Sequence, residues 1–290
     1  MILECNIQSW RGPFGAAVRA RAVAGLETGA VLYFPGLTFN LMAGEEKFLD
    51  AAVSDGKAKN ISLDPLTGTL QGTSLTGERA YALAAMIERF GASAMALIDA
   101  LLPYRHVERA RTSYRPVQVE GRAYSKTNDD RLLHVDAFPS RPTRGRRILR
   151  FFATIALPSG TAARRWRLGE PFEDFARQFL PRVSPHGPSK SWLLDKLGIT
   201  QGRRSRYDEL MLALHDAAKL DADFQAHSPQ TAVSFAPGSC WLVLTDQVLH
   251  AVLSGERALE QTFHFDIAEM IQPARAPLKV LERLSGKTLV

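Results

Sequence analysis

The stretch LLHVDAF, residues 132–138, places a histidine and an aspartate two residues apart among apolar neighbours. Residues i and i+2 of a strand project from the same face, so one strand end can present His134 and Asp136 to a single ion. We therefore predict a short strand over residues 131–135 that ends at this pair. An imidazole and a carboxylate at one strand end indicate a metal site.

A facial triad for iron(II) adds one more histidine from a distant strand and leaves positions open for substrate and oxygen. His250 follows a Pro-Gly turn and lies among strand-like residues. A single histidine is more often an ordinary core or surface residue than a metal ligand. His264-Phe265-Asp266 repeats the two-residue spacing, but no histidine follows it, so a later strand cannot supply its third ligand. We predict that His134, Asp136 and His250 are the metal ligands and that the iron centre they hold is catalytic.

Short β-branched and aromatic runs punctuated by Gly and Pro predict strands on both sides of these ligands. The predicted strands cover residues 30–34, 117–124, 147–157, 231–235, 240–244, 248–253 and 258–265. Residues 62–77 predict a loop or tight hairpin. Apolar residues at three- and four-residue steps predict a helix over residues 78–102, with weaker helical patterns over 45–54 and from Tyr207. This order predicts a mainly β protein with flanking helices, as a β-barrel or sandwich.

We expect one domain over residues 1–290, with two domains as the alternative. Residues 1–104 would form a mixed strand and helix part that packs on a core over residues 105–270. That core would carry a helical insertion at about residues 172–220, and residues 271–290 would form a C-terminal tail.

The composition predicts a globular cytoplasmic protein. Hydrophobic residues make up 46% and charged residues 23% of the chain, enough for a sizeable core. Cys5 and Cys240 are the only cysteines, so a disulfide framework is excluded, and the first ten residues lack the pattern of a signal peptide. Charges interrupt residues 80–102, so no membrane crossing is expected. The net charge of +6 favours an anionic partner.

Four strings carry a resemblance to a known family: SYRP at 113–116, LLHVDAF at 132–138, RILRFF at 147–152 and HAVLSGERALEQTF at 250–263. They resemble the Kdo hydroxylase family of iron(II)/2-oxoglutarate-dependent dioxygenases, over most of the chain from about Gly29. The resemblance implies a double-stranded β-helix (jelly-roll) core, with Fe(II), 2-oxoglutarate as cosubstrate and O2. It also implies hydroxylation at C3 of 3-deoxy-D-manno-oct-2-ulosonic acid (Kdo), giving D-glycero-D-talo-oct-2-ulosonic acid, succinate and CO2.

The implied partner is a Kdo-containing lipid A or lipopolysaccharide precursor, so we expect peripheral contact with an anionic membrane surface, on the cytoplasmic face of the inner membrane. The far carboxylate of 2-oxoglutarate needs a cation, for which bidentate pairing favours arginine. Arg150, in phase with Ile148 and Phe152, is favoured over Arg257, which follows His250 closely. The expected substrate-binding residues are Arg115, Arg122, Lys126, Arg144 and Arg146.

Four alternatives are considered at this stage. An iron oxygenase of the same fold can act on another small or lipid-linked substrate, because fold and triad do not specify what is oxidised. The arginines at 141–150 can simply form a solvated face. The chain can also be a non-enzymatic nucleic-acid-binding protein that uses these arginines. The last is disfavoured because no helix-turn-helix, zinc finger or RNA-binding signature is present, so we expect no nucleic acid partner. An inactive β-helix protein is disfavoured because all three ligand types are present.

Overall fold

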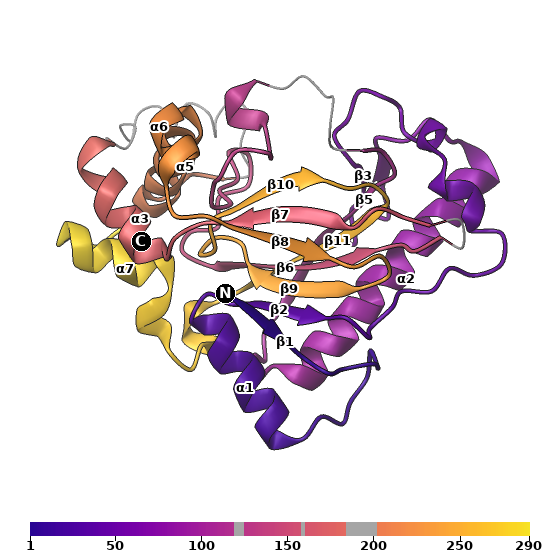
Figure 1. The fold of residues 1–290 in the computed structure, drawn as a ribbon, viewed down its shortest axis with the longest axis horizontal. Helices are drawn as coiled ribbons and strands as arrows, with labels where there is room; N and C mark the ends of the chain where they lie inside the picture. The colour runs from indigo at the N-terminus through magenta and orange to yellow at the C-terminus, as the bar shows by residue number, and fades with distance from the viewer. Residues whose placement is uncertain (119–124, 158–159, 184–201) are drawn as a thin grey trace.

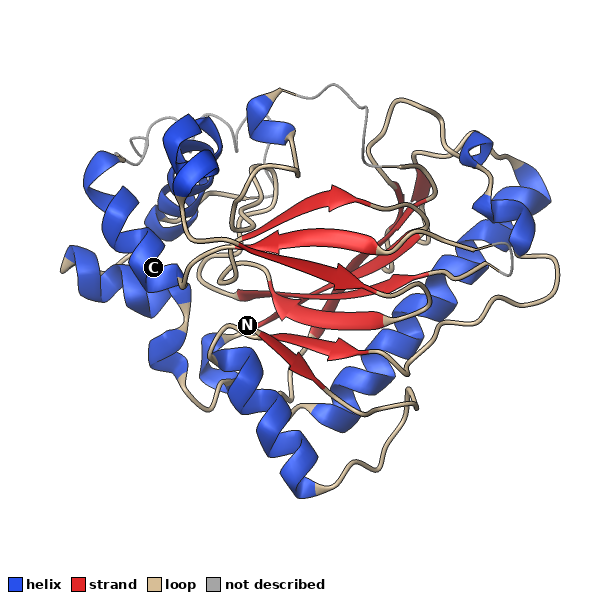
Figure 2. Cartoon of the chain, viewed as in Figure 1, coloured by secondary structure: helices blue, strands red, loops and turns tan. Residues whose placement is uncertain are grey.

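Two β-sheets and a set of flanking helices make up the computed structural model, which describes residues 1–118, 125–157, 160–183 and 202–290 (Figures 1 and 2). The large sheet has the order β1 (Ile2–Glu4), β2 (Val31–Phe34), β9 (Cys240–Leu244), β6 (Arg147–Thr154), β11 (Ala258–Phe265), β5 (Glu108–Arg115), β3 (Ile61–Leu63) and β4 (Leu70–Gln71). The small sheet has the order β10 (His250–Ser254), β7 (Arg164–Leu168) and β8 (Thr231–Phe235).

All strand pairs between these named strands are antiparallel except β1 with β2. One face of the large sheet packs on the small sheet through stacked aromatic rings. Trp241 stacks on Phe152 and on Phe235, at ring-centroid distances of 5.3 and 4.0 Å, and Trp166 packs edge-on against them. Burial of these large rings drives the two sheets together.

Two helices cover the opposite face of the large sheet: α1 (Ala16–Glu27) and α2 (Gly77–Leu101) (Figure 1). The helical spacing of Leu83, Ile87 and Phe90 gives α2 a continuous buried stripe that packs on β5 and β11. Among the described residues, α2 alone has the length and apolar composition to span a membrane. Its buried stripe lies in the protein core, which accounts for that composition.

A second group of helices packs at one end of the sheets (Figure 2). The loop that carries the LLHVDAF stretch packs against these helices. These helices are α3 (Phe172–Phe179), α5 (Arg206–Leu220), α6 (Ala222–His227) and α7 (Pro277–Ser285). Leu133 and Val135 are fully buried among them. Leu133 and Val135 therefore anchor the loop among the helices. His134 and Asp136, which alternate with them, point to the other side of the loop.

The structure confirms the mainly β class with flanking helices, the 78–102 helix, the 62–77 hairpin and the later strands. The predicted strand at 131–135 is wrong, because only His134 pairs there, in an isolated bridge to His250. Residues 45–54 form two 3-10 helices, η1 (Glu46–Leu49) and η2 (Ala51–Val53), and not an α-helix. Residues 117 and 118 are not in a strand, and the rest of the predicted 117–124 strand lies outside the described residues. The domain division stays a prediction.

Candidate metal centre

His134, Asp136 and His250 converge in a buried site. One ligand-type atom from each side chain lies within 4.8 Å of the others, and no second such group of three occurs within the described ranges. The Nε2 atoms of His134 and His250 lie 3.7 and 3.9 Å from Oδ1 of Asp136. These separations are too long for hydrogen bonds, and they leave room for an ion between the three atoms. Two imidazoles and one carboxylate form the donor set of a non-haem iron(II) oxygenase.

Backbone pairing holds the two histidines in register. The amide of His134 donates to the carbonyl of His250 at 3.1 Å, and the reverse bond is 2.9 Å. Each ring also donates from Nδ1, His134 to the Leu132 carbonyl at 2.7 Å and His250 to the Val248 carbonyl at 2.8 Å. These bonds fix the tautomer and leave both Nε2 lone pairs free for a metal.

The charge states of the three ligands suit a divalent cation. Burial lowers the pKa of His134 and of His250, so both imidazoles are neutral at neutral pH. Burial acts to raise the pKa of Asp136, but the neighbouring Arg150 guanidinium outweighs it and holds that pKa well below its usual range. Metal binding therefore needs no proton release from this site at neutral pH, and the residues present fit an iron(II) ion.

Arg150 projects from β6 toward the triad, in phase with Phe152 as predicted. Its Nη1 donates to Oδ2 of Asp136 at 2.6 Å, and its Nη2 pairs with Glu260 on β11. The guanidinium also lies over the Phe152 ring, 5.2 Å from its centroid. Two carboxylates thus already neutralise Arg150. Its assignment to 2-oxoglutarate stays a prediction.

A cavity of about 370 Å³ opens beside the triad, between the two sheets and helix α5. Five cationic side chains line this metal cavity: Lys59, Arg115, Arg150, Arg164 and Lys219. Four carboxylates line it as well: Asp130, Asp136, Asp216 and Glu260. The lining therefore carries one excess positive charge, which a bound divalent metal would increase to three. Such a cavity favours anionic guests.

Arg164, which sequence reasoning missed, is the least compensated of these cations. It is 3% exposed, its Nη1 donates to the Gly255 carbonyl at 3.3 Å, and its Nε has no hydrogen-bond partner. Burial, followed by the nearby Arg115 guanidinium, lowers the pKa of Arg164 to about 9. No carboxylate in the described parts of the chain forms an ion pair with it. The alternation in RRWRL (164–168) puts Arg164 and Trp166 on one face of a strand, but this pattern does not distinguish a ligand-binding arginine from an ordinary buried one.

The other predicted ligand-binding residues are scattered. Arg115 lines the metal cavity, where it donates to Asn60 at 2.7 Å and pairs with Asp130 at 3.3 Å. Lys126 is exposed and does not line the cavity, although the two residues after it do. Arg257 also lies off the cavity, donating to the Leu49 carbonyl and pairing with Glu256. Arg122 lies outside the described residues.

The arginine run at 141–150 does not form one surface. Arg147 is fully buried, with Nε and Nη2 donating to Asp246 at 2.8 and 3.0 Å. Arg144 is exposed and donates to the Arg203 carbonyl at 3.3 Å. Arg141 and Arg146 line a separate cavity of about 250 Å³. The sequence showed the charge density but not this division into separate environments.

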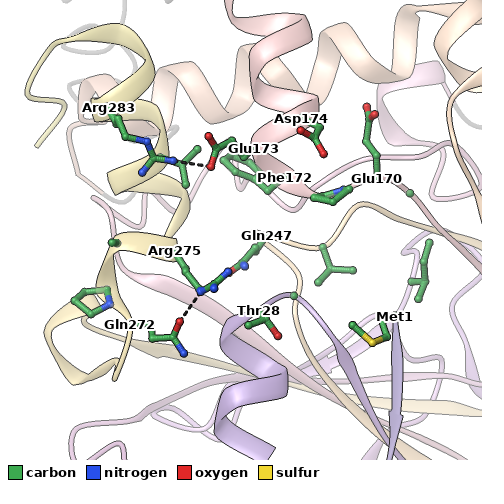
Figure 3. Close-up of a pocket in the computed structure, with 18 residues that line it drawn as sticks. Met1, Thr28, Glu170, Phe172, Glu173, Asp174, Gln247, Gln272, Arg275 and Arg283 are labelled. Carbon is green, nitrogen blue, oxygen red and sulfur yellow. Dashed lines mark hydrogen bonds and ion pairs between the residues drawn. The ribbon is translucent and has the colours of Figure 1, made fainter.

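A larger cavity, about 870 Å³, lies away from the triad, between the N-terminal residues and helices α3 and α7 (Figure 3). Its arginines are occupied: Arg283 pairs with Glu173 at 2.6 Å, and Arg275 donates to Gln272 at 2.5 Å. Size alone therefore does not mark the active site. The donor chemistry of the smaller metal cavity does.

Comparison with known proteins identifies the architecture. The chain matches the family described as 3-deoxy-D-manno-oct-2-ulosonic acid (Kdo) hydroxylase over residues 10–288. Two similar solved structures are those of the Kdo hydroxylase KdoO, a non-haem Fe(II) α-ketoglutarate-dependent dioxygenase, in complex with α-ketoglutarate and Fe(III) and in complex with cobalt(II). They are 45% and 46% identical, with TM-scores of 0.94 and 0.95, and each match covers 100% of this chain and 97% of the other.

A search of curated proteins gives no significant match. The similarity to KdoO extends over both sheets and the flanking helices, which confirms the double-stranded β-helix (jelly-roll) core expected from the sequence. Because the family match and the structural match both span nearly the whole length, this chain belongs to the Kdo hydroxylase family.

Proposed function

We propose that this chain hydroxylates C3 of Kdo in lipopolysaccharide or Kdo-lipid A, giving D-glycero-D-talo-oct-2-ulosonic acid with release of succinate and CO2. Membership of the family makes it an iron(II)/2-oxoglutarate-dependent dioxygenase that acts on Kdo. One observation carries the assignment in the molecule itself. The His134, Asp136 and His250 triad is buried at the wall of a cavity with excess positive charge.

The chain's own residues hold and shield the reaction centre. Iron, when bound by the triad, supplies the oxygen activation that 2-oxoglutarate oxidation drives. The two Nδ1 hydrogen bonds keep His134 and His250 in the metal-binding tautomer. Trp166 stacks on the His250 ring at 5.3 Å and, with Phe152, closes the metal cavity against water on the side of the small sheet. Shielding of this kind suits oxidation of an unactivated C–H bond, because water would intercept a reactive oxidant.

We also propose that Arg164 binds the far carboxylate of 2-oxoglutarate, with Arg150 as the alternative. Arg150 is already paired with Asp136 and Glu260, whereas Arg164 has no carboxylate partner among the described residues. A buried unpaired charge is costly, so a ligand anion at Arg164 would relieve that cost. The two carboxylates of 2-oxoglutarate are separated by three carbons, which favours a cation away from the metal ligands. Arg150 would then position Asp136.

The remaining cations suit the carboxylate of Kdo. Lys219 is 3% exposed and donates to the Thr127 carbonyl at 3.0 Å, and Arg115 lies across the same metal cavity. The formal charges also match: the lining with a divalent metal carries three positive charges, and dianionic 2-oxoglutarate plus one sugar carboxylate carries three negative ones. Charge balance of this kind favours a sugar acid over a neutral sugar.

We further propose that the acceptor is lipid-linked and that the protein works peripherally at an anionic membrane surface on the cytoplasmic face. The net charge of +6 supports this, because basic residues near anionic lipids contribute about 1 kcal/mol each. The test is turnover of purified protein with Fe(II), 2-oxoglutarate and either free Kdo or Kdo-lipid A. Turnover of free Kdo at a rate similar to that of Kdo-lipid A would contradict the requirement for a lipid-linked acceptor. The assignment of Kdo as the sugar that is hydroxylated would still stand.

A further inference from the structure

A second cleft lies beside the metal cavity, along the face of the large sheet that bears Arg150 and Glu260. It has a volume of about 250 Å³, and residues from β5, the loop before β6, and β11 line it. The boundary between the two is an aromatic contact, since Phe138 lines the metal cavity and packs edge-on against His264 of the cleft at 6.4 Å. A ligand long enough to pass this contact would reach both spaces.

The distance between the metal cavity and the cleft follows from the separation of their lining residues along the shared strands. Residues two apart on a strand share a face, so Glu260 in the metal cavity and His264 in the cleft lie on one side of β11. Arg115 and Arg111 have the same relation on β5. Four residues of strand span about 13 Å. The cleft therefore lies roughly one sugar unit or more beyond the metal cavity.

The cleft holds more positive charge than its carboxylates compensate. Arg146 is paired with Glu108 at 2.8 Å, but Arg111 has only Asp64 at 3.8 Å, and its Nε has no hydrogen-bond partner. Arg141 forms no ion pair with any carboxylate in the described ranges. Burial and the neighbouring Arg111 guanidinium lower the pKa of Arg141. Two guanidiniums thus lie close together with one distant carboxylate between them, an arrangement that an added anion would stabilise.

We propose that this arginine cleft, formed by Arg111, Arg141 and Arg146, binds a phosphate ester on the same acceptor whose Kdo enters the metal cavity. This rests on the proposed function. A phosphate monoester carries almost two charges and several acceptor oxygens, which suits two forked guanidinium donors. The cleft, at about 250 Å³, has room for a phosphate group. The phosphate would fix the direction in which the acceptor lies across the sheet.

The test compares Arg111→Gln and Arg141→Gln with the parent on two acceptors, Kdo-lipid A and the same acceptor after phosphatase treatment. Arg19→Gln on α1, exposed on the opposite side of the large sheet, is the control for lost charge. We expect the KM for the phosphorylated acceptor to rise about tenfold in each cleft variant, as loss of a charged hydrogen bond predicts. We expect no change with the treated acceptor or in Arg19→Gln.

Binding measurements separate this inference from the proposed function. Calorimetric titration of the parent and both cleft variants with inorganic phosphate reports on the cleft whether or not Kdo is hydroxylated. Weaker phosphate binding in the variants supports the cleft, and equal binding overturns it. The KM of the cleft variants could instead rise equally for the phosphatase-treated acceptor, and only when anionic vesicles are present. That result would show that the cleft binds membrane lipid, and it would also overturn the proposal. Failure of the parent to hydroxylate Kdo would instead contradict the proposed function.

Discussion

Arg150 donates from Nη1 to Oδ2 of Asp136 at 2.6 Å, so the only carboxylate of the metal triad is held by a cation from the adjacent strand β6. Glu260 on β11 holds the other end of that guanidinium. The chain from Glu260 through Arg150 to Asp136 orients a metal ligand, as hydrogen-bonded partners of metal ligands commonly do. It also explains why a buried carboxylate beside two imidazoles stays ionised.

Replacing any one of His134, Asp136 or His250 with Ala should abolish turnover, because two protein ligands do not hold the ion in place. The fold should persist, since both sheets pack independently of the triad. The measurements are bound metal per chain and 2-oxoglutarate-dependent succinate release. His227→Ala, at an exposed histidine paired with Asp223, is the matched control and should match the parent. Near-normal activity in a triad variant would remove that residue from the ligand set.

Arg164→Gln and Arg150→Gln should have different effects. Arg164→Gln should raise the dissociation constant for 2-oxoglutarate at least tenfold, because loss of one charge-assisted pair to a buried partner costs about 2–5 kcal/mol. Arg150→Gln should chiefly weaken metal binding, by about 10- to 100-fold, as loss of a metal ligand's supporting partner does. Titration of 2-oxoglutarate and of Co(II) into both proteins decides the matter. A larger 2-oxoglutarate defect in Arg150→Gln would restore the sequence-based assignment.

Asp246→Ala should destabilise the fold without touching the metal cavity. Its carboxylate is fully buried and accepts two hydrogen bonds from Arg147, so its removal leaves a buried charge unpaired. Breaking such a pair costs about 3–5 kcal/mol. Glu173→Ala, which removes a surface partner of Arg177 and Arg283, should cost less than about 1 kcal/mol. Urea unfolding of both variants measures the difference, and equal costs would contradict the structural role given to Asp246.

Activity on lipid-linked Kdo should fall as salt rises, while activity on free Kdo changes less. Exposed attractions are largely screened beyond about 8 Å at physiological ionic strength, so capture at an anionic surface weakens. Reversing Arg144 and Arg146 to Glu together should weaken capture and leave uncoupled 2-oxoglutarate consumption near the parent value. The structure divides this pair, because only Arg146 lines the arginine cleft. Testing each single variant shows which of them matters, and an unaffected double variant would leave this arginine run as a solvated face.

The sequence predicted the pair His134 and Asp136 and most strands because each rests on local spacing, whereas His250 followed from the need of a facial triad for a distant histidine. It placed His134 and Asp136 on a strand, whereas they lie in a loop whose apolar residues Leu133 and Val135 are anchored among helices. That anchoring is tertiary, so no local pattern reveals it. Arg164 was missed for a related reason: its lack of a carboxylate partner depends on which strands are neighbours, and sequence periodicity does not report that.

The most direct test of the account is product analysis with the purified protein. Kdo-lipid A is incubated with Fe(II), 2-oxoglutarate and O2, and the released sugar acid is examined by mass spectrometry and NMR. The account predicts one added oxygen at C3 of Kdo, one succinate formed for each hydroxyl, and neither product from His134→Ala. Succinate formation with an unmodified Kdo, or an oxygen placed on any carbon other than C3, would contradict it.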